Sequence, residues 1–128
     1  MKYKLLTLIS FIVFSTSCQT TQKDSNIEVI NSEKLKTLIK NDGVQFVDVR
    51  TMAEFKENNI QGAENIVFDE NFASKLDKFD KDKPIVIYCR SGRRSAASAK
   101  ILDKNGFSKI YDLDGGILKW IEEGNEVN

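Results

Sequence analysis

Residues 85–88 constrain the fold more than any other part of the chain. Pro84 is followed by Ile85-Val86-Ile87-Tyr88, an unbroken apolar run rich in strand-forming residues. A strand with one solvated face alternates apolar and polar side chains, whereas a strand covered on both faces is apolar throughout. The run therefore predicts a central strand of a parallel sheet with helices on both faces.

Short apolar runs alternate with helical patterns from Ile27 to the end of the chain. The expected strands cover residues 27–30, 44–49, 65–68, 85–88 and 109–113. The expected helices are one capped by Asn31 or Ser32, one opened by Thr51, one bearing Phe72, Leu76 and Phe79, one from Ser95 to Lys104, and one bearing Ile117, Trp120 and Ile121. This alternation predicts an α/β domain with an open, mostly parallel five-stranded sheet.

A cysteine follows the predicted central strand directly. It opens the stretch Cys89-Arg90-Ser91-Gly92-Arg93-Arg94-Ser95, which leads into the predicted helix from Ser95. Ligands of open α/β sheets bind beyond the carboxyl ends of the strands, where Cys89 would lie. Inward backbone N–H groups, a helix N-terminus and arginines would all favour its reactive thiolate form. The pattern indicates an activated cysteine; the alternative is a small residue that fills the core.

Composition excludes several classes of function. The 128-residue chain has 19 basic and 19 acidic residues and no histidine. The charge balance gives no basic field for nucleic acid, and the missing histidine excludes a Cys–His catalytic pair and the commonest zinc ligand. We expect no metal and no organic cofactor. Any chemistry has to use Cys89, carboxylates, hydroxyls, arginines and the backbone.

Residues 1–17 have the pattern of an export signal. Lys2 and Lys4 precede a short apolar stretch, 5–14, and small residues precede Cys18. This junction resembles the lipobox of bacterial lipoproteins, although Ser15 stands where that pattern usually has leucine. We therefore expect a lipid anchor on Cys18 and a location in the bacterial cell envelope, periplasmic or extracytoplasmic. Ordinary cleavage to a soluble secreted protein is the alternative.

The same pattern divides the chain into three parts: an export signal at 1–17, a polar tether at 18–26 and one folded domain at 27–128. A disulfide between Cys18 and Cys89 is a further possibility in an exported protein. Lipid attached to the Cys18 sulfur would exclude that disulfide.

The chain from Ile27 onward resembles a single-domain rhodanese, a member of a sulfurtransferase family. The resemblance rests on four separated segments in the family's order. They are Asp48-Val49-Arg50 with Glu54-Phe55, Ile60-Gln61-Gly62-Ala63-Glu64-Asn65-Ile66, Cys89 to Ser95, and Leu113-Asp114-Gly115-Gly116-Ile117-Leu118-Lys119-Trp120. The chain departs from the family at Asn58-Asn59, where Gly-His is usual.

The resemblance implies sulfur transfer in two steps. Cys89 would attack the outer sulfur of a small anionic donor such as thiosulfate, and the resulting persulfide would pass sulfur to cyanide, a thiol or a protein acceptor. The substrate-binding residues would be Arg90, Ser91, Gly92, Arg93, Arg94 and Ser95. Asp48 and Arg50 would orient this loop or form a structural ion pair.

The sequence is also compatible with two other functions. Small rhodanese-like domains also serve as persulfide carriers or regulatory docking modules without turnover. Related cysteine phosphatases and arsenate reductases use a seven-residue loop that cradles a tetrahedral anion. Arg94 is only the sixth residue counted from Cys89, and the smaller loop favours a single sulfur atom.

Overall fold

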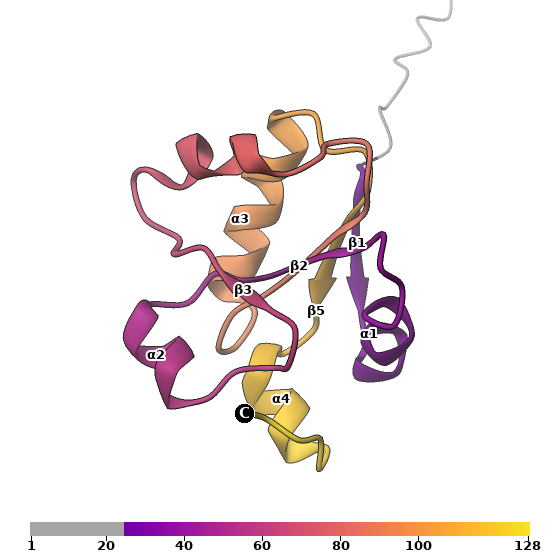
Figure 1. Ribbon diagram of the computed structural model, residues 1–128, viewed down its shortest axis with the longest axis vertical. Coiled ribbons are helices and arrows are strands. Elements are labelled where there is room, and N and C mark those ends of the chain that lie inside the picture. Colours follow the sequence, from indigo (N-terminus) through magenta and orange to yellow (C-terminus); the bar gives the residue numbers. More distant parts are fainter. Residues whose placement is uncertain (1–24) are drawn as a thin grey trace, which may run out of the picture.

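The computed structural model describes residues 25–128, whose five strands form one parallel sheet in the order β1-β5-β4-β2-β3 (Figure 1). The strands are β1 (Ile27–Ile30), β2 (Gln45–Asp48), β3 (Glu64–Asn65), β4 (Ile85–Tyr88) and β5 (Ile110–Leu113). The helices are α1 (Ser32–Leu38), α2 (Met52–Glu57), the 3-10 helix η1 (Phe72–Lys78), α3 (Arg93–Lys104) and α4 (Gly116–Glu122). The predicted α/β class and the five-stranded sheet are confirmed.

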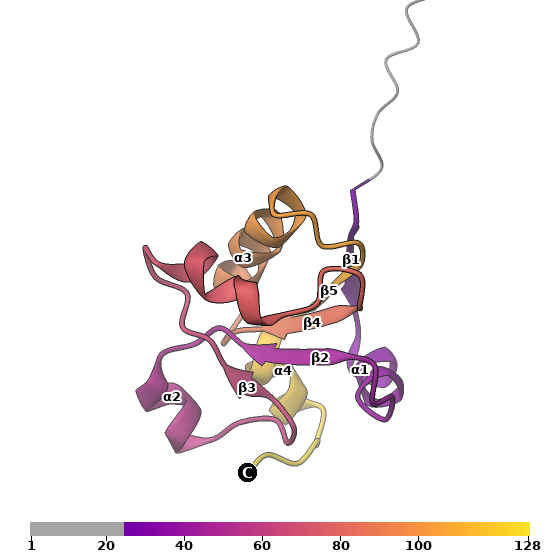
Figure 2. The ribbon, with the colours of Figure 1, turned by 45° about the horizontal axis from the view of Figure 1, so that its top comes forward.

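Strand β4 is the central strand, as its apolar run predicted. All four of its residues are buried, and it pairs with β2 on one side and β5 on the other (Figure 2). Its carboxyl end leads directly to Cys89. The strand therefore fixes the position of the cysteine between two neighbouring strands.

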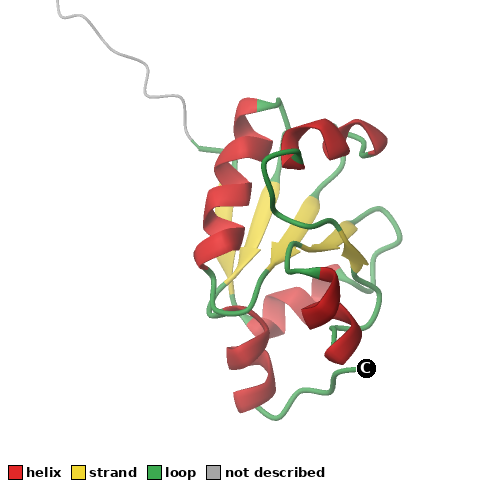
Figure 3. Cartoon of the chain, turned by 90° about the vertical axis from the view of Figure 1, so that its left-hand side faces the viewer, coloured by secondary structure: helices red, strands yellow, loops and turns green. Residues whose placement is uncertain are grey.

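Helices cover both faces of the sheet (Figure 3). On one face, α3 and η1 pack against inward residues of β2, β4 and β5, a cluster that includes Val47, Ile87, Leu102 and Phe72. On the other face, α1 and α4 pack against Phe46, Val86 and Tyr88. Cys89 belongs to the face covered by α3.

Three elements differ from the prediction by more than one residue at an end or in helix type. Strand β3 covers only Glu64–Asn65 and pairs with β2 alone at the edge of the sheet. The helix predicted around Phe72 is a 3-10 helix, closed by the bond from the Phe79 N–H to the Leu76 carbonyl. Helix α3 begins at Arg93 rather than Ser95.

The predicted helix starts at Asn31 and Thr51 are confirmed. The Asn31 side chain accepts the Lys34 N–H, and Thr51 forms a reciprocal capping box with Glu54. Within residues 25–128, no helix is long and apolar enough to cross a membrane. The export signal, Cys18 and the tether up to residue 24 lie outside the described residues.

Candidate active site

The Cys89 thiol lies at the base of the loop between β4 and α3. Its residue is 1% exposed, and its sulfur is a free thiol within the described part of the chain. The Gly92 N–H donates to Cys89 Sγ over 3.0 Å. A backbone N–H directed at sulfur favours negative charge on that atom. The cysteine thus contacts the apolar core and also has the polar partner that a purely structural cysteine lacks.

The loop is tight because Gly92 adopts a left-handed conformation. Its φ is +103°, a region that residues with a Cβ rarely adopt. Only Arg90, Ser91 and Gly92 lie between Cys89 and the first residue of α3. Ser95, in the first turn of α3, also contacts the thiol, since Cys89 Sγ donates to Ser95 Oγ over 3.5 Å.

The number of amides facing the sulfur is smaller than expected. Inward N–H groups were expected along the loop from Arg90 to Ser95, but among the described residues only the Gly92 amide bonds the sulfur. The early start of α3 explains the difference, because amides from Arg93 onward align with the helix axis. Ser95 instead contributes its hydroxyl, which also donates to the Gly92 carbonyl over 3.2 Å.

The start of α4 holds the backbone of the loop. The Ile117 N–H donates to the Cys89 carbonyl over 2.9 Å, and the Leu118 N–H donates to the Arg90 carbonyl over 3.1 Å. Gly116 packs so closely that a Cβ there would lie 2.4 Å from the Cys89 carbonyl oxygen. These contacts hold the backbone of Cys89 and Arg90, which precede Gly92 by three and two residues.

The three arginines of the loop have different surroundings. Arg94 forms a two-pronged ion pair with Glu54, with both N–O distances at 2.8 Å. Arg90 and Arg93 are exposed, and neither forms an ion pair among the described residues. Arg90 and Arg93 therefore carry the uncompensated positive charge, whereas Arg94 ties α3 to α2.

Asp48 and Arg50 form a buried ion pair, one of the two roles expected for them. Three bonds of 2.7–3.1 Å join the Arg50 guanidinium to the Asp48 carboxylate, and the residues are 3% and 0% exposed. Arg50 also donates to the carbonyl of Asn58 over 2.7 Å. The pair thus joins the carboxyl end of β2 to the end of α2, and none of its hydrogen bonds reaches Cys89.

The chain matches a family model described as the rhodanese-like domain over residues 31–123. This match covers most of the chain. The chain belongs to the rhodanese-like family.

Relatives and solved structures agree with this assignment. The rhodanese-like chain is 34% identical to the thiosulfate sulfurtransferase GlpE of Shewanella oneidensis, covering 77% of this chain and 96% of that protein. It is 40% identical to the uncharacterized protein YqhL of Bacillus subtilis, spanning 60% of that protein. A crystal structure of a rhodanese-related protein from Thermoplasma volcanium superposes with a TM-score of 0.65 at 33% identity, covering 79% of this chain and 97% of that one.

Not all relatives are named for the same activity. The chain is 33% identical to a tRNA uridine(34) hydroxylase of Acinetobacter baumannii, over 73% of this chain but only 32% of that protein. Together, the family and the relatives named sulfurtransferases support sulfurtransferase activity in general.

Asn58 and Asn59, the departure from the family pattern, have structural partners in this rhodanese-like domain. Asn58 ends α2 and accepts from Arg50 through its carbonyl. Asn59 exchanges two backbone hydrogen bonds with Asn128, of 2.8 and 3.3 Å. The C-terminus is thereby held beside the segment that follows α2.

The Glu54–Arg94 pair predicts a pH dependence of stability. Hydrogen bonding to Arg94 holds the pKa of Glu54 at about 2, although burial alone would raise it. A lowered folded-state pKa contributes stability above the ordinary value near 4.5, and this is lost as pH falls towards 2. Glu54→Gln keeps the capping box. We expect it to cost about 1 kcal/mol near neutral pH, allowing for solvent screening of this partly exposed pair.

Urea unfolding of both proteins across the acid range measures this effect. The difference in unfolding free energy between wild type and Glu54→Gln should shrink steadily as the pH falls below about 4.5. A difference that stays constant with pH would show that Arg94 does not stabilise the ionised Glu54.

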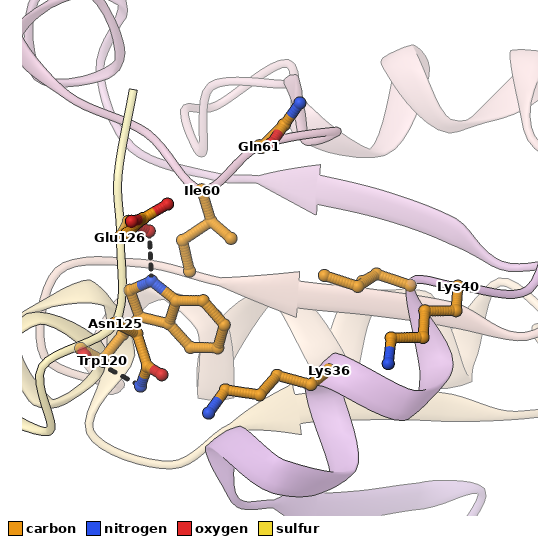
Figure 4. Close-up of a pocket in the computed structure, with 8 residues that line it drawn as sticks. Lys36, Lys40, Ile60, Gln61, Trp120, Asn125 and Glu126 are labelled. Carbon is orange, nitrogen blue, oxygen red and sulfur yellow. Dashed lines mark hydrogen bonds between the residues drawn. The ribbon is translucent and has the colours of Figure 1, made fainter.

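Two clefts of the rhodanese-like domain bear on the site. One, of about 190 Å³, lies beside the active-site loop and is lined by Arg50, Glu54, Glu57, Asn58, Arg90, Ile117, Leu118 and Ile121. The other, of about 290 Å³, lies between α1 and the C-terminal segment, where Lys36 approaches the Trp120 ring (Figure 4). Trp120 is a core residue there, and its indole N–H donates to the Glu126 carbonyl over 2.8 Å.

Sequence reasoning missed Asp112 and the backbone role of α4. Asp112 lies on β5 and is 6% exposed, and its only sequence signal is a carboxylate inside an apolar strand.

No cluster of three or more metal-ligating side chains occurs among residues 25–128.

Proposed function

We propose that this protein is a sulfurtransferase that moves a sulfane sulfur from a thiosulfate-like donor to a thiophilic acceptor through a persulfide on Cys89. The observation that carries the proposal is the Gly92 N–H directed at Cys89 Sγ over 3.0 Å, at the base of a six-residue loop. The family and the sulfurtransferase relatives support it. The donor, the acceptor and the persulfide are the proposed parts.

The first step forms the persulfide on Cys89. The Cys89 thiolate attacks the outer sulfur of thiosulfate, a new S–S bond forms, and sulfite leaves with the electron pair of the old bond. The persulfide then carries one negative charge on its terminal sulfur. The Gly92 N–H would stabilise this charge, and Arg90 and Arg93 would attract the dianionic donor.

The second step transfers the sulfur from the Cys89 persulfide to the acceptor. Cyanide or a thiol attacks the terminal sulfur, and the electron pair of the S–S bond returns to Cys89 as a thiolate. Because the donor product leaves before the acceptor reacts, the kinetics should follow a ping-pong scheme. A protein thiol is a further candidate acceptor. In this proposal residues 1–18 place the enzyme in the cell envelope, independently of the chemistry.

A thiocyanate assay tests the function. We expect the purified protein to form thiocyanate from thiosulfate and cyanide over many turnovers, and Cys89→Ser to form none, because oxygen cannot hold the transferable sulfur. Cys18→Ser is the matched control and should retain full activity. A lasting persulfide on Cys89 without turnover would instead assign a carrier role, and inactivity with every sulfane donor tested would refute the proposal.

A further inference from the structure

The cleft between α1 and the C-terminal segment has no part in the proposed sulfur transfer. Its volume is about 290 Å³, and none of its lining residues belongs to the active-site loop. The apolar side chains of Ile39, Ile60 and Trp120 line it together with the lysines Lys36 and Lys40. A concave, mostly apolar surface with a few charged groups is the usual form of a binding site for a small organic molecule.

Hydrogen bonds fix the walls of this cleft. Trp120, on α4, is 5% exposed, and its indole N–H donates to the Glu126 carbonyl over 2.8 Å. The Asn125 side chain donates to the Trp120 carbonyl over 3.0 Å. The Ile60 N–H donates to the Tyr88 hydroxyl over 3.0 Å, and the Ile60 side chain points towards the indole (Figure 4). Because these walls are already held in place, a ligand pays little to order them.

A second cleft adjoins the first. Its volume is about 380 Å³, and it shares Ile39 and Gln61 with the first cleft. The rest of its lining is Val44, Phe46 and Gly62, which carry no charge. The two clefts together form an elongated apolar groove beside α1, which we call the α1 groove. An elongated apolar groove fits an extended chain better than a rounded molecule.

The charges at the α1 groove favour an anion. Lys40 is exposed and forms no ion pair among the described residues. Lys36 pairs with the exposed Glu33 over 2.8 Å, and its ammonium lies 5.9 Å from the centre of the Trp120 ring. Glu126 is the acidic residue of the lining, and Figure 4 shows its carboxylate beyond the indole, away from both lysines. The lysine side of the groove therefore has an excess of positive charge.

We propose that the α1 groove binds a free medium-chain fatty acid, a carboxylate on an unbranched aliphatic chain. The carboxylate accepts from the Lys36 and Lys40 ammonium groups, and the chain lies against Ile39, Ile60 and Trp120 towards the second cleft. Burial of methylene groups supplies most of the affinity, and the two ammonium groups select an anion. The site is separate from Cys89, and this inference does not rest on the proposed function.

The fluorescence of Trp120, the one tryptophan of the chain, reports binding directly. The full chain is titrated with octanoate, octanol and octylammonium, each below the concentration at which it forms micelles. Octanoate should change the emission in a saturable way, with a Kd of about 1 mM or tighter. Octanol should bind about fivefold more weakly, and octylammonium more weakly still, because it meets two cations. Hexanoate should bind about tenfold more weakly than octanoate, because it buries fewer methylene groups.

Methionine variants test the charged side of the groove. Lys36→Met and Lys40→Met keep the aliphatic stem of each side chain and remove its charge. The double variant should bind octanoate at least about fivefold more weakly and octanol as wild type does. The matched control combines Lys100→Met with Lys104→Met, because both lysines are exposed on α3, which covers the other face of the sheet. This control should leave the affinity for octanoate unchanged.

Three results would each overturn the proposal: no saturable change with octanoate, equal binding of octanoate and octylammonium, or an unchanged affinity of the lysine double variant. If a second copy of the chain filled the groove instead, the affinity for octanoate would fall as the protein concentration rises, which would also overturn it. The three-ligand comparison uses wild type alone, so it holds even if the double variant does not fold. Cys89→Ser should bind octanoate as wild type does, so fatty-acid binding and thiocyanate formation are tested separately.

Discussion

Gly116→Ala should destabilise the fold by about 2–4 kcal/mol and lower thiocyanate formation at least about tenfold. A Cβ at this position would lie 2.4 Å from the Cys89 carbonyl oxygen and 2.5 Å from that of Arg90. Both atoms are backbone, so no side chain can rotate away. The φ of Gly116, +59°, adds a conformational cost for alanine.

The loss of activity follows from the same contacts. The two carbonyls are the acceptors for the Ile117 and Leu118 N–H groups, and displacing them moves the loop that directs the Gly92 N–H at sulfur. A shift of about 1 Å at a reacting centre lowers rates strongly.

Urea unfolding and the thiocyanate assay measure the two effects of Gly116→Ala. Gly124→Ala is the matched control, because Gly124 has a φ of +83° and nothing within 4 Å of an added Cβ. It should show the conformational cost alone and keep its activity. Equal behaviour of the two variants would contradict the role assigned to the close contact between α4 and the loop.

Asp48→Asn should cost about 3–5 kcal/mol of stability, because it leaves the Arg50 guanidinium buried without a counter-ion. Arg50 is 3% exposed, and its other bonds go to Asn58, which is neutral. The pair joins the end of β2 to the segment after α2, so its loss should also loosen the wall of the cleft beside the loop.

Denaturant unfolding of Asp48→Asn checks this value. The control is Glu28→Gln, which removes a carboxylate from the exposed ion pair with Lys109 and should leave the unfolding midpoint almost unchanged. A small effect of Asp48→Asn, similar to that of the control, would mean that Arg50 finds water or another partner when its counter-ion is removed.

The sequence was sufficient to predict the elements that depend on periodic burial. The apolar run of β4 placed Cys89 at a strand end, and the side-chain caps at Asn31 and Thr51 marked two helix starts. These features are local, because they depend on a residue's own type and its near neighbours in the chain. The buried Asp48–Arg50 pair is also local, since its members are two residues apart.

The rest of the site depends on contacts between distant segments. The contact of Gly116 with the Cys89 carbonyl and the Arg94–Glu54 pair join residues far apart in sequence. The direction of each loop amide depends on the start of α3, which lay two residues earlier than predicted. Asp112 gave a weak signal, because one polar residue within a short strand is equally compatible with an exposed position.

The central claim is that Cys89 holds a transferable sulfur, and the mass of its peptide tests this most directly. The full chain is incubated with thiosulfate and no acceptor. The mass of the Cys89 peptide is then measured by mass spectrometry before and after addition of cyanide. We predict a gain of about 32 Da on Cys89, which cyanide removes as thiocyanate. No gain on Cys89, or a gain confined to Cys18, would contradict the account.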